Sequence, residues 1–202
     1  MTRAFTEISF TPSVRALQTQ NGSADGYSKF MAPEADRADR IGPAEAEFIS
    51  GRDGFYQATV SENGWPYVQF RGGPTGFLKV LDDQTIAYAD FRGNRQYLSA
   101  GNLTDNDRIS MILMDYPNRR RLKIWGRATQ IGSSENQAFM ANIQDTSYRG
   151  RPARAVVSTI HALDCTCPQH HPQRKTIDEQ QPKQDTHRVH THHPASAHDQ
   201  PR

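Results

Sequence analysis

Runs of hydrophobic and β-branched residues typical of β-strands follow one another through the middle of the chain, and the run at 121–131 alternates with period two, as a half-buried strand does. These runs cover residues 55–60, 65–71, 77–81, 85–90, 108–115, 121–131 and 153–163. Turn residues separate the stretches, as at 62–64 and 82–83. Short antiparallel strands with a turn about every ten residues predict a small β-barrel.

Helical signals interrupt the strand pattern at two places. Residues 95–103 are predicted to form a short helix. Ser133 or Ser134 is expected to cap a second helix, which runs through Ile143. The expected fold class is therefore mainly β with flanking helices, and the barrel domain is assigned to residues 51–163.

The first part of the chain, residues 1–50, is predicted to form a helical arm. Thr11 followed by Pro12 is a favourable N-cap and N1 pair, and Pro43 begins a further helix that reaches Ile49. The apolar stripe of this arm is weak. We therefore expect the arm to lie across a larger surface or a partner subunit.

The composition changes after Leu163. No aromatic residue follows Tyr148, and seven of the eight histidines lie beyond Asp164. Such a segment buries too little apolar surface to offset its chain entropy. Residues 164–202 are therefore expected to form a polar, histidine-rich tail that is mostly disordered.

The overall charge argues against a strongly nucleic-acid-seeking protein. The chain has 24 basic and 22 acidic residues, for a formal net charge of +2. The basic run of Arg119 to Arg121 with Lys123 is typical of a solvated loop or a ligand contact. No apolar run approaches the roughly 20 residues of a membrane span, and the first residues lack a secretory signal pattern. We expect a soluble, cytoplasmic protein with no nucleic-acid partner.

Two cysteines and two histidines lie close together near the end of the barrel. Cys165, Cys167, His170 and His171 are residue types that bind Zn²⁺, but their spacing differs from the usual C-x2-C pattern. A metal site and a structural role both remain open, and no metal ligand is assigned.

The block from Trp65 to Gln96 is the most informative for chemistry. A strand ends in Arg71, a glycine-rich turn follows at 72–76, and Lys79 lies on the returning strand. Asn94 to Gln96 are predicted to open a helix, where free backbone N–H groups favour anions. These residues suit a phosphate cradle for a flat cofactor. They also suit two ordinary solvated loops, and the residues alone leave both readings open.

Several segments resemble one known family in their order and spacing. They are GWPYVQFR at 64–71, AYAD at 87–90, GNRQ at 93–96, DRISMIL at 107–113 and IWGRA at 124–128. Together they resemble the pyridoxamine 5'-phosphate oxidase-like, FMN-binding split-barrel family over roughly residues 43–172. The RGGPTGFL turn and the later CPQH segment are similar to its subgroup of predicted flavin-nucleotide-binding proteins.

The resemblance implies an antiparallel split β-barrel with FMN as its cofactor. Arg71 and Lys79 fall at the basic positions of two strands that hold the FMN phosphate. Asn94, Arg95 and Gln96 match the polar run at the start of the helix, again on the phosphate.

The resemblance also implies contacts to the rest of the flavin at the interface of a homodimer. Tyr88 and Ala89 match strand residues whose backbone passes the ribityl chain and the ring. Arg121 falls where the oxidase has a glutamine that reaches the ring from the second subunit. A cation there would favour the anionic reduced flavin and raise its potential.

Substrate recognition departs from the oxidase itself. The polar tail replaces the oxidase's folded, arginine-rich end, and residues 72–76 are extra. Vitamin B6 oxidation is therefore not supported. We expect an FMN-dependent oxidoreductase with an unknown small-molecule substrate, NAD(P)H being one candidate donor. The alternatives are a non-catalytic flavin carrier or sensor and a haem- or metal-binding protein on the same fold. No residue is assigned a catalytic role.

Overall fold

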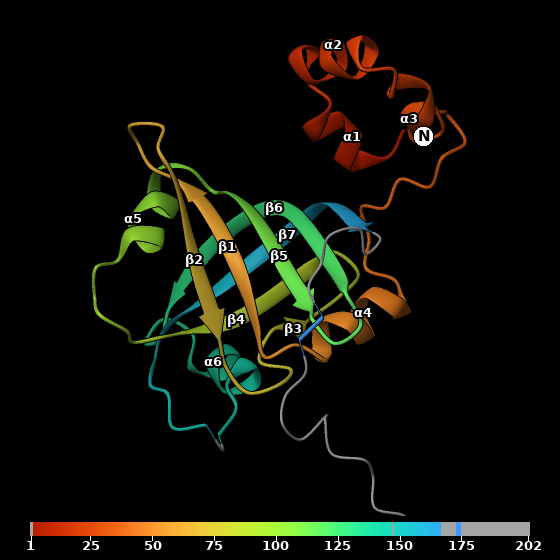
Figure 1. Cartoon of the computed structure of the whole chain (residues 1–202). Helices are drawn as coiled ribbons and strands as arrows, with labels where there is room; N and C mark the ends of the chain where they lie inside the picture. Colours follow the sequence, from red (N-terminus) through yellow and green to blue (C-terminus); the bar gives the residue numbers. More distant parts are fainter. Residues whose placement is uncertain (1, 147, 167–172, 175–202) are drawn as a thin grey trace, which may run out of the picture.

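The computed structural model describes residues 2–146, 148–166 and 173–174, and Figure 1 gives the arrangement of their elements. Seven strands in this part of the chain form one antiparallel sheet in the order β2-β1-β5-β6-β7-β4-β3. The strands are β1 (Gly54–Val60), β2 (Pro66–Gly72), β3 (Lys79–Val80), β4 (Thr85–Phe91), β5 (Arg108–Asp115), β6 (Arg120–Gly132) and β7 (Pro152–Thr166). The sheet curves into a split barrel, which confirms the predicted fold class.

The predicted strand at 77–81 is shorter than expected. Only Lys79 and Val80 pair with β4, opposite Ala87 and Ile86. Phe77 instead closes a turn, in which its N–H donates to the carbonyl oxygen of Pro74 at 2.9 Å. Phe77 and Leu78 are buried in the core, and this burial, rather than strand pairing, holds the segment in place.

The core fills the inside of the barrel with side chains from most of the strands. Its fully buried members include Phe55, Met111, Leu113, Ile124 and Ile160. Helix α4 (Pro43–Ser50) adds Phe48 and Ile49 to the same cluster, although the sequence pattern had grouped this helix with the arm.

Three further helices form the rest of the N-terminal arm: α1 (Ala4–Ser9), α2 (Pro12–Gln20) and α3 (Ala24–Met31). The Thr11 side chain accepts a hydrogen bond from the Val14 N–H at 3.4 Å, as its N-cap position predicts. Ala4 and Phe5 of α1 pack against Ala162 of β7. The arm also contacts the barrel through backbone hydrogen bonds, from the Ile41 N–H to the Asp83 carbonyl oxygen and from the Leu163 N–H to the Ala38 carbonyl oxygen.

The two helices within the barrel domain begin later than predicted. Helix α6 (Gln137–Ile143) is capped by Asn136, whose Oδ1 accepts from the Phe139 N–H at 3.0 Å, so the expected cap at Ser133 or Ser134 is wrong. Helix α5 (Leu98–Asp105) begins three residues after Arg95. Arg95 and Tyr97 have φ angles of 61° and 56°, which a right-handed helix excludes.

Cys167, His170, His171 and the tail from residue 175 onward are not among the described residues, and Cys165 is exposed at the end of β7. Within the described ranges, no helix combines the length and the hydrophobicity needed to cross a bilayer.

Candidate functional site

A cavity of about 430 Å³ opens where the barrel is split, between β2 and β4. Strand β2 lies at one end of the sheet order, and β4 lies next to the other end, so their facing sides are not hydrogen-bonded to each other. The cavity is lined by the inward side chains of β2, the end of β4 with the loop that follows it as far as Tyr97, the start of α5 and two residues of β7. Polar side chains from distant segments therefore meet at one opening.

Three charged side chains bridge this opening, and we call them the inner ion triad: Arg71, Asp90 and Arg154. Arg71 Nη1 donates to Asp90 Oδ1 at 2.6 Å, across from β2 to β4. Arg154 lies opposite Asp90 in the β4–β7 register, and its Nε is 3.5 Å from Asp90 Oδ2. The side chains are 14%, 12% and 22% exposed, so the triad is largely withdrawn from water.

Arg154 is held from two further sides. Its Nη1 donates to Gln130 Oε1 at 2.9 Å, and its guanidinium carbon lies 5.5 Å from the ring centre of Tyr97. Gln130 is itself fixed, because its Nε2 donates to the carbonyl oxygen of Ala100 at 2.9 Å. The guanidinium is therefore positioned before any ligand arrives.

Burial changes the titration of two groups on β4. Burial raises the pKa of Asp90, and the neighbouring Arg71 and Arg154 oppose this rise only in part. Burial also raises the pKa of Tyr88, whose hydroxyl donates to Gln57 Oε1 at 2.8 Å inside the core. Tyr88 is therefore a neutral core residue.

The outer wall of the cavity is the loop that leads into α5. Arg92, Asn94, Arg95 and Gln96 are exposed there and line the cavity. Asn94 Oδ1 accepts a hydrogen bond from the Gln96 N–H at 3.1 Å, which holds the loop in a tight turn. The lining as a whole has four arginines and one aspartate, an excess of positive charge that suits a phosphate ester.

The structure brings together four of the residues that the sequence and the family resemblance single out: Arg71, Asn94, Arg95 and Gln96 all line the cavity. It does not place Asn94 to Gln96 on the helix, as expected, because α5 begins at Leu98. Their side chains and turn, rather than amide groups of the helix, form this wall.

The other four predicted residues do not line this cavity. Lys79 lies on β3 opposite Ala87. Tyr88 is in the barrel core, and Ala89 is buried in the cluster that contains Met140 and Ile143 of α6. Arg121 lies on β6 opposite Met114, away from the cavity of its own chain.

Sequence reasoning gave no role to three charged residues of the site, Asp90, Arg92 and Arg154. Asp90 was noted as part of a motif without a role, and Arg154 only as part of the last strand. A single arginine between Ala153 and Ala155 in an otherwise apolar run was the available signal, since an unpaired charge is rarely buried.

The residues present fit the phosphate end of FMN. Nε of Arg71 and Nε of Arg154 are both buried and have no hydrogen-bond acceptor. Buried donors are normally satisfied, so these two mark a place where the chain alone does not complete the polar network. The side chains of Tyr88 and Ala89, in contrast, are enclosed in the core, so the flavin contact implied by the family resemblance stays a prediction for their backbone.

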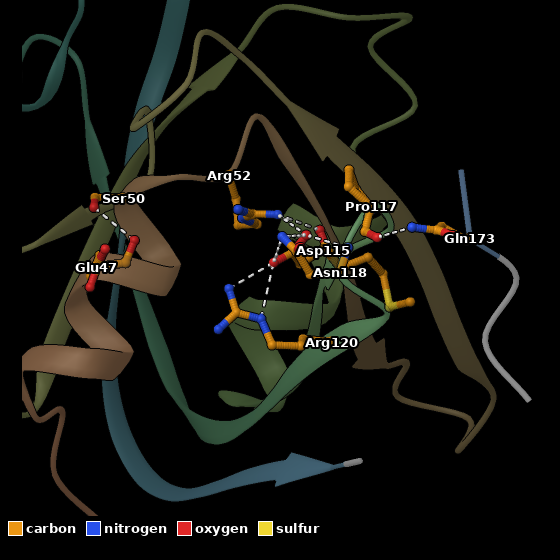
Figure 2. Close-up of polar contacts among 9 residues, drawn as sticks. Glu47, Ser50, Arg52, Asp115, Pro117, Asn118, Arg120 and Gln173 are labelled. Carbon is orange, nitrogen blue, oxygen red and sulfur yellow. Dashed lines mark hydrogen bonds and ion pairs between the residues drawn. The ribbon is translucent and has the colours of Figure 1, made fainter. Parts of the chain in front are cut away.

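A second polar cluster surrounds Asp115 and is shown in Figure 2. The Asp115 side chain is 1% exposed and accepts hydrogen bonds from Arg120 Nη2 at 2.9 Å and from Asn118 Nδ2 at 3.0 Å. Arg52 Nη1 lies 3.5 Å from its Oδ1. Both arginines also stack on the ring of Phe48, at 4.9 and 5.5 Å.

This cluster is a structural tie between two segments of the chain. Burial alone would raise the pKa of Asp115, but the hydrogen bonds from Arg120 and Asn118 and the nearby charge of Arg52 outweigh it, and the pKa is lowered. Each carboxylate oxygen already has partners, so the cluster fastens the β5–β6 turn to the segment between α4 and β1.

Comparison with known sequences decides the family. The profile of the pyridoxamine 5'-phosphate oxidase family matches residues 41–164, more than half of the chain. This chain belongs to the pyridoxamine 5'-phosphate oxidase-like family. The matched range begins just before α4 and ends within β7, so it contains nearly all of the split barrel and all the residues that line the cavity. No curated protein matches the chain.

The chain is also similar to solved structures at low sequence identity. HupZ from Group A Streptococcus superposes with a TM-score of 0.51 at 16% identity, covering 67% of this chain and 99% of HupZ. An FMN-binding protein from Syntrophomonas wolfei has a TM-score of 0.47 at 14% identity, covering 77% and 95%. HutZ, the haem storage protein from Vibrio cholerae, has a TM-score of 0.39 at 16% identity, covering 62% and 94%. At these identities the likeness concerns the fold alone, and the cofactor has to be argued from the cavity.

Proposed function

We propose that this chain is a cytoplasmic FMN-binding flavoprotein and an oxidoreductase that acts on a small substrate. The observation that carries the proposal is the cavity at the barrel seam, with four arginines, one aspartate and two buried guanidinium donors that lack acceptors. When bound, the flavin supplies hydride or electron transfer, and the protein supplies its position and electrostatic environment.

Arg71 and Arg95 are the proposed main contacts of the flavin phosphate. Arg71 reaches the cavity from β2 and Arg95 from the loop before α5, so the two cations approach from different walls. Charge-assisted hydrogen bonds of this kind are among the strongest polar contacts available to a phosphate. Asn94 and Gln96 add neutral donors beside Arg95. A ligand without the phosphate would lose all of these contacts.

The proposal includes a homodimer, and the outer face of β2, β1 and β5 supports it. Phe70 lies opposite Tyr56, and Tyr56 lies opposite Ile112, so their side chains form one row across three strands. Val68, Phe70, Tyr56 and Ile112 are 58%, 57%, 41% and 37% exposed. A continuous apolar face of this kind is typical of an interface. Figure 1 shows β2, β1 and β5 side by side on the near side of the barrel.

The same face gives Arg121 its proposed role. Arg121 is in register with Met114 of β5, two residues along from Ile112, and so lies beside the apolar row. A symmetric dimer places this region of each chain against the other chain. We assign Arg121 to the flavin ring of the second subunit, as the family resemblance implies, where its charge would stabilise the reduced, anionic ring.

The cofactor of the purified protein tests this function. The protein is isolated without added cofactor, its absorption spectrum is recorded, and the released small molecule is weighed after denaturation. The expected result is FMN, with an absorption band at about 450 nm. A Soret band and haem, with no flavin even after incubation with FMN, would overturn it. NAD(P)H oxidation by the FMN-loaded protein then distinguishes an oxidoreductase from a flavin carrier or sensor.

A further inference from the structure

The inner ion triad has two positive charges and only one negative charge. Arg71 and Arg154 share one carboxylate, Asp90, and all three side chains are at most 22% exposed. A charge withdrawn from water is costly unless an opposite charge accompanies it. The triad therefore carries one buried positive charge that lacks a counter-charge within its own group.

The donors of the triad are also incompletely used. An arginine has five N–H donors. Among the described residues, Arg71 makes one hydrogen bond, to Asp90, and Arg154 makes one, to Gln130. Both residues line the cavity, and in both the Nε is buried and makes no hydrogen bond, although Nε of Arg154 lies 3.5 Å from Asp90 Oδ2. Unmet donors and an unbalanced charge in the same wall point to an anion.

The guanidinium group of Arg154 is held in place by its neighbours. Gln130 holds its Nη1, Tyr97 lies against its guanidinium, and Asp90 lies beside its Nε. These three contacts come from β6, from the residue before α5 and from β4. A cation held on three sides next to a cavity is preorganised for a ligand, which lowers the entropic cost of binding.

We propose that Arg154 is a second inner contact of the bound phosphate monoester and that Asp90 is the residue that positions both Arg154 and Arg71 for it. This inference rests on the proposed function, since the phosphate is that of FMN. It extends the site from the loop at 92–96 to strand β7, so the phosphate lies between an exposed and a buried pair of arginines.

The experiment compares FMN with riboflavin, which lacks the phosphate. Arg154→Ala is expected to weaken FMN binding about 10- to 100-fold and to leave riboflavin binding unchanged. Arg127→Ala is the matched control, because Arg127 is paired with Asp107 and does not line the cavity. Binding is measured by the quenching of flavin fluorescence. An equal loss for both flavins, or no loss for FMN, would overturn the assignment of Arg154.

The role of Asp90 has its own pair of variants. Asp90→Ala is expected to weaken FMN binding, because it releases both arginines, and Asp90→Asn is expected to recover part of the loss, because its amide oxygen still accepts from Arg71. If Asp90 instead competed with the phosphate, both variants would bind FMN more tightly. That result would contradict a positioning role.

Inorganic phosphate separates this inference from the proposed function. Its binding to the wild type and to Arg154→Ala is followed by ³¹P line broadening, with thermal melting to verify that both proteins are folded. If the protein binds no flavin but binds phosphate in an Arg154-dependent manner, the anion site stands and the flavin function fails. If FMN binds equally well without Arg154, the flavin function stands and this inference fails.

Discussion

Arg95 and Arg71 line the same cavity but differ in burial and in ion pairing. Arg71 is largely buried and paired with Asp90, whereas Arg95 is exposed and makes no ion pair among the described residues. The backbone of Arg95 has a φ of 61°, a conformation that costs about 1 kcal/mol for a residue with a side chain. Backbone strain of this kind is common in loops that bind ligands, where it sets the position of a side chain.

Arg95→Ala is therefore expected to weaken FMN binding without affecting the fold. The loss of a charge-assisted phosphate contact corresponds to about 1.5–3 kcal/mol, or about 10- to 150-fold in Kd. Fluorescence titration measures the change, with Arg127→Ala as the control. An unchanged Kd would remove Arg95 from the phosphate site.

The hydroxyl of Tyr88 stabilises the core rather than the ligand. Tyr88→Phe removes the hydrogen bond to Gln57 and leaves a buried amide oxygen without its donor. We expect a loss of about 1–2 kcal/mol in the free energy of unfolding. FMN affinity should not change, because the Tyr88 side chain does not line the cavity. A large loss of FMN affinity in a fully stable variant would contradict this placement.

Asp115 contributes stability that depends on pH. Its pKa is lowered in the folded state, so its contribution is complete above the unfolded value of about 3.9 and is lost as the pH falls through the folded value. Asp115→Asn is expected to cost about 3 kcal/mol at neutral pH, because Arg52 and Arg120 lose their counter-charge. In urea unfolding, this difference should shrink below about pH 4.

The exposed pair of Asp107 and Arg127 is the control for that measurement. Its side chains are 43% and 46% exposed, so Asp107→Asn should cost less than about 1 kcal/mol at any pH. A cost for Asp115→Asn as small as this would show that the tie in Figure 2 does not hold the β5–β6 turn.

At the scale of elements, a bulge shapes the long β6–β7 ladder. Trp125 pairs with Ala162 and Gly126 pairs with Ile160, so His161 has no partner in the register. A Cβ on Gly126 would overlap the carbonyl oxygen of Thr159. This glycine therefore permits the close approach of two backbones at the bend of the barrel.

Gly126→Ala is expected to destabilise the barrel by about 1–3 kcal/mol, because backbone atoms of β7 would have to move. Gly26→Ala in α3 is the control, since nothing lies within 4 Å of the added Cβ. The control should be neutral or slightly stabilising. Chemical denaturation distinguishes the two, and equal stability of both variants would contradict a tight bulge at Gly126.

The sequence pattern predicts some secondary-structure elements and not their pairing. The pattern of hydrophobic and β-branched residues predicts most of the strands, and at 121–131 a half-buried strand imposes period two on its side chains. It does not predict the pairing of Asp90 with Arg154, which depends on the register of β4 against β7. The start of α5 was misplaced for a local reason, the positive φ angles of Arg95 and Tyr97. Residue type does not reveal such a conformation unless it is glycine or asparagine.

The family resemblance identified more residues of the site than the hydrophobic pattern did. It singled out Arg71 and the run Asn94–Gln96, which the structure brings to one cavity. It could not identify Arg154, because it carries over only matched positions. Lys79 and Arg121 stay predictions for the phosphate and the ring, since neither lines the cavity of its own chain.

At the scale of the whole molecule, the apolar face of β2, β1 and β5 predicts association. Phe70→Glu is expected to convert the proposed dimer to a monomer, because two copies of the charge would be buried at a symmetric interface. Sedimentation velocity measures the change. Leu17→Glu is the control, since Leu17 is also exposed, at 58%, but lies in the arm. A wild type that sediments as a monomer would contradict this interface.

The ratio of FMN to riboflavin affinity for the wild-type protein tests the central claim most directly, because the two ligands differ only in the phosphate. If the arginines of the seam cavity hold that phosphate, FMN should bind at least about 100-fold more tightly than riboflavin. Equal affinities, or tight riboflavin binding with no gain from the phosphate, would contradict the account.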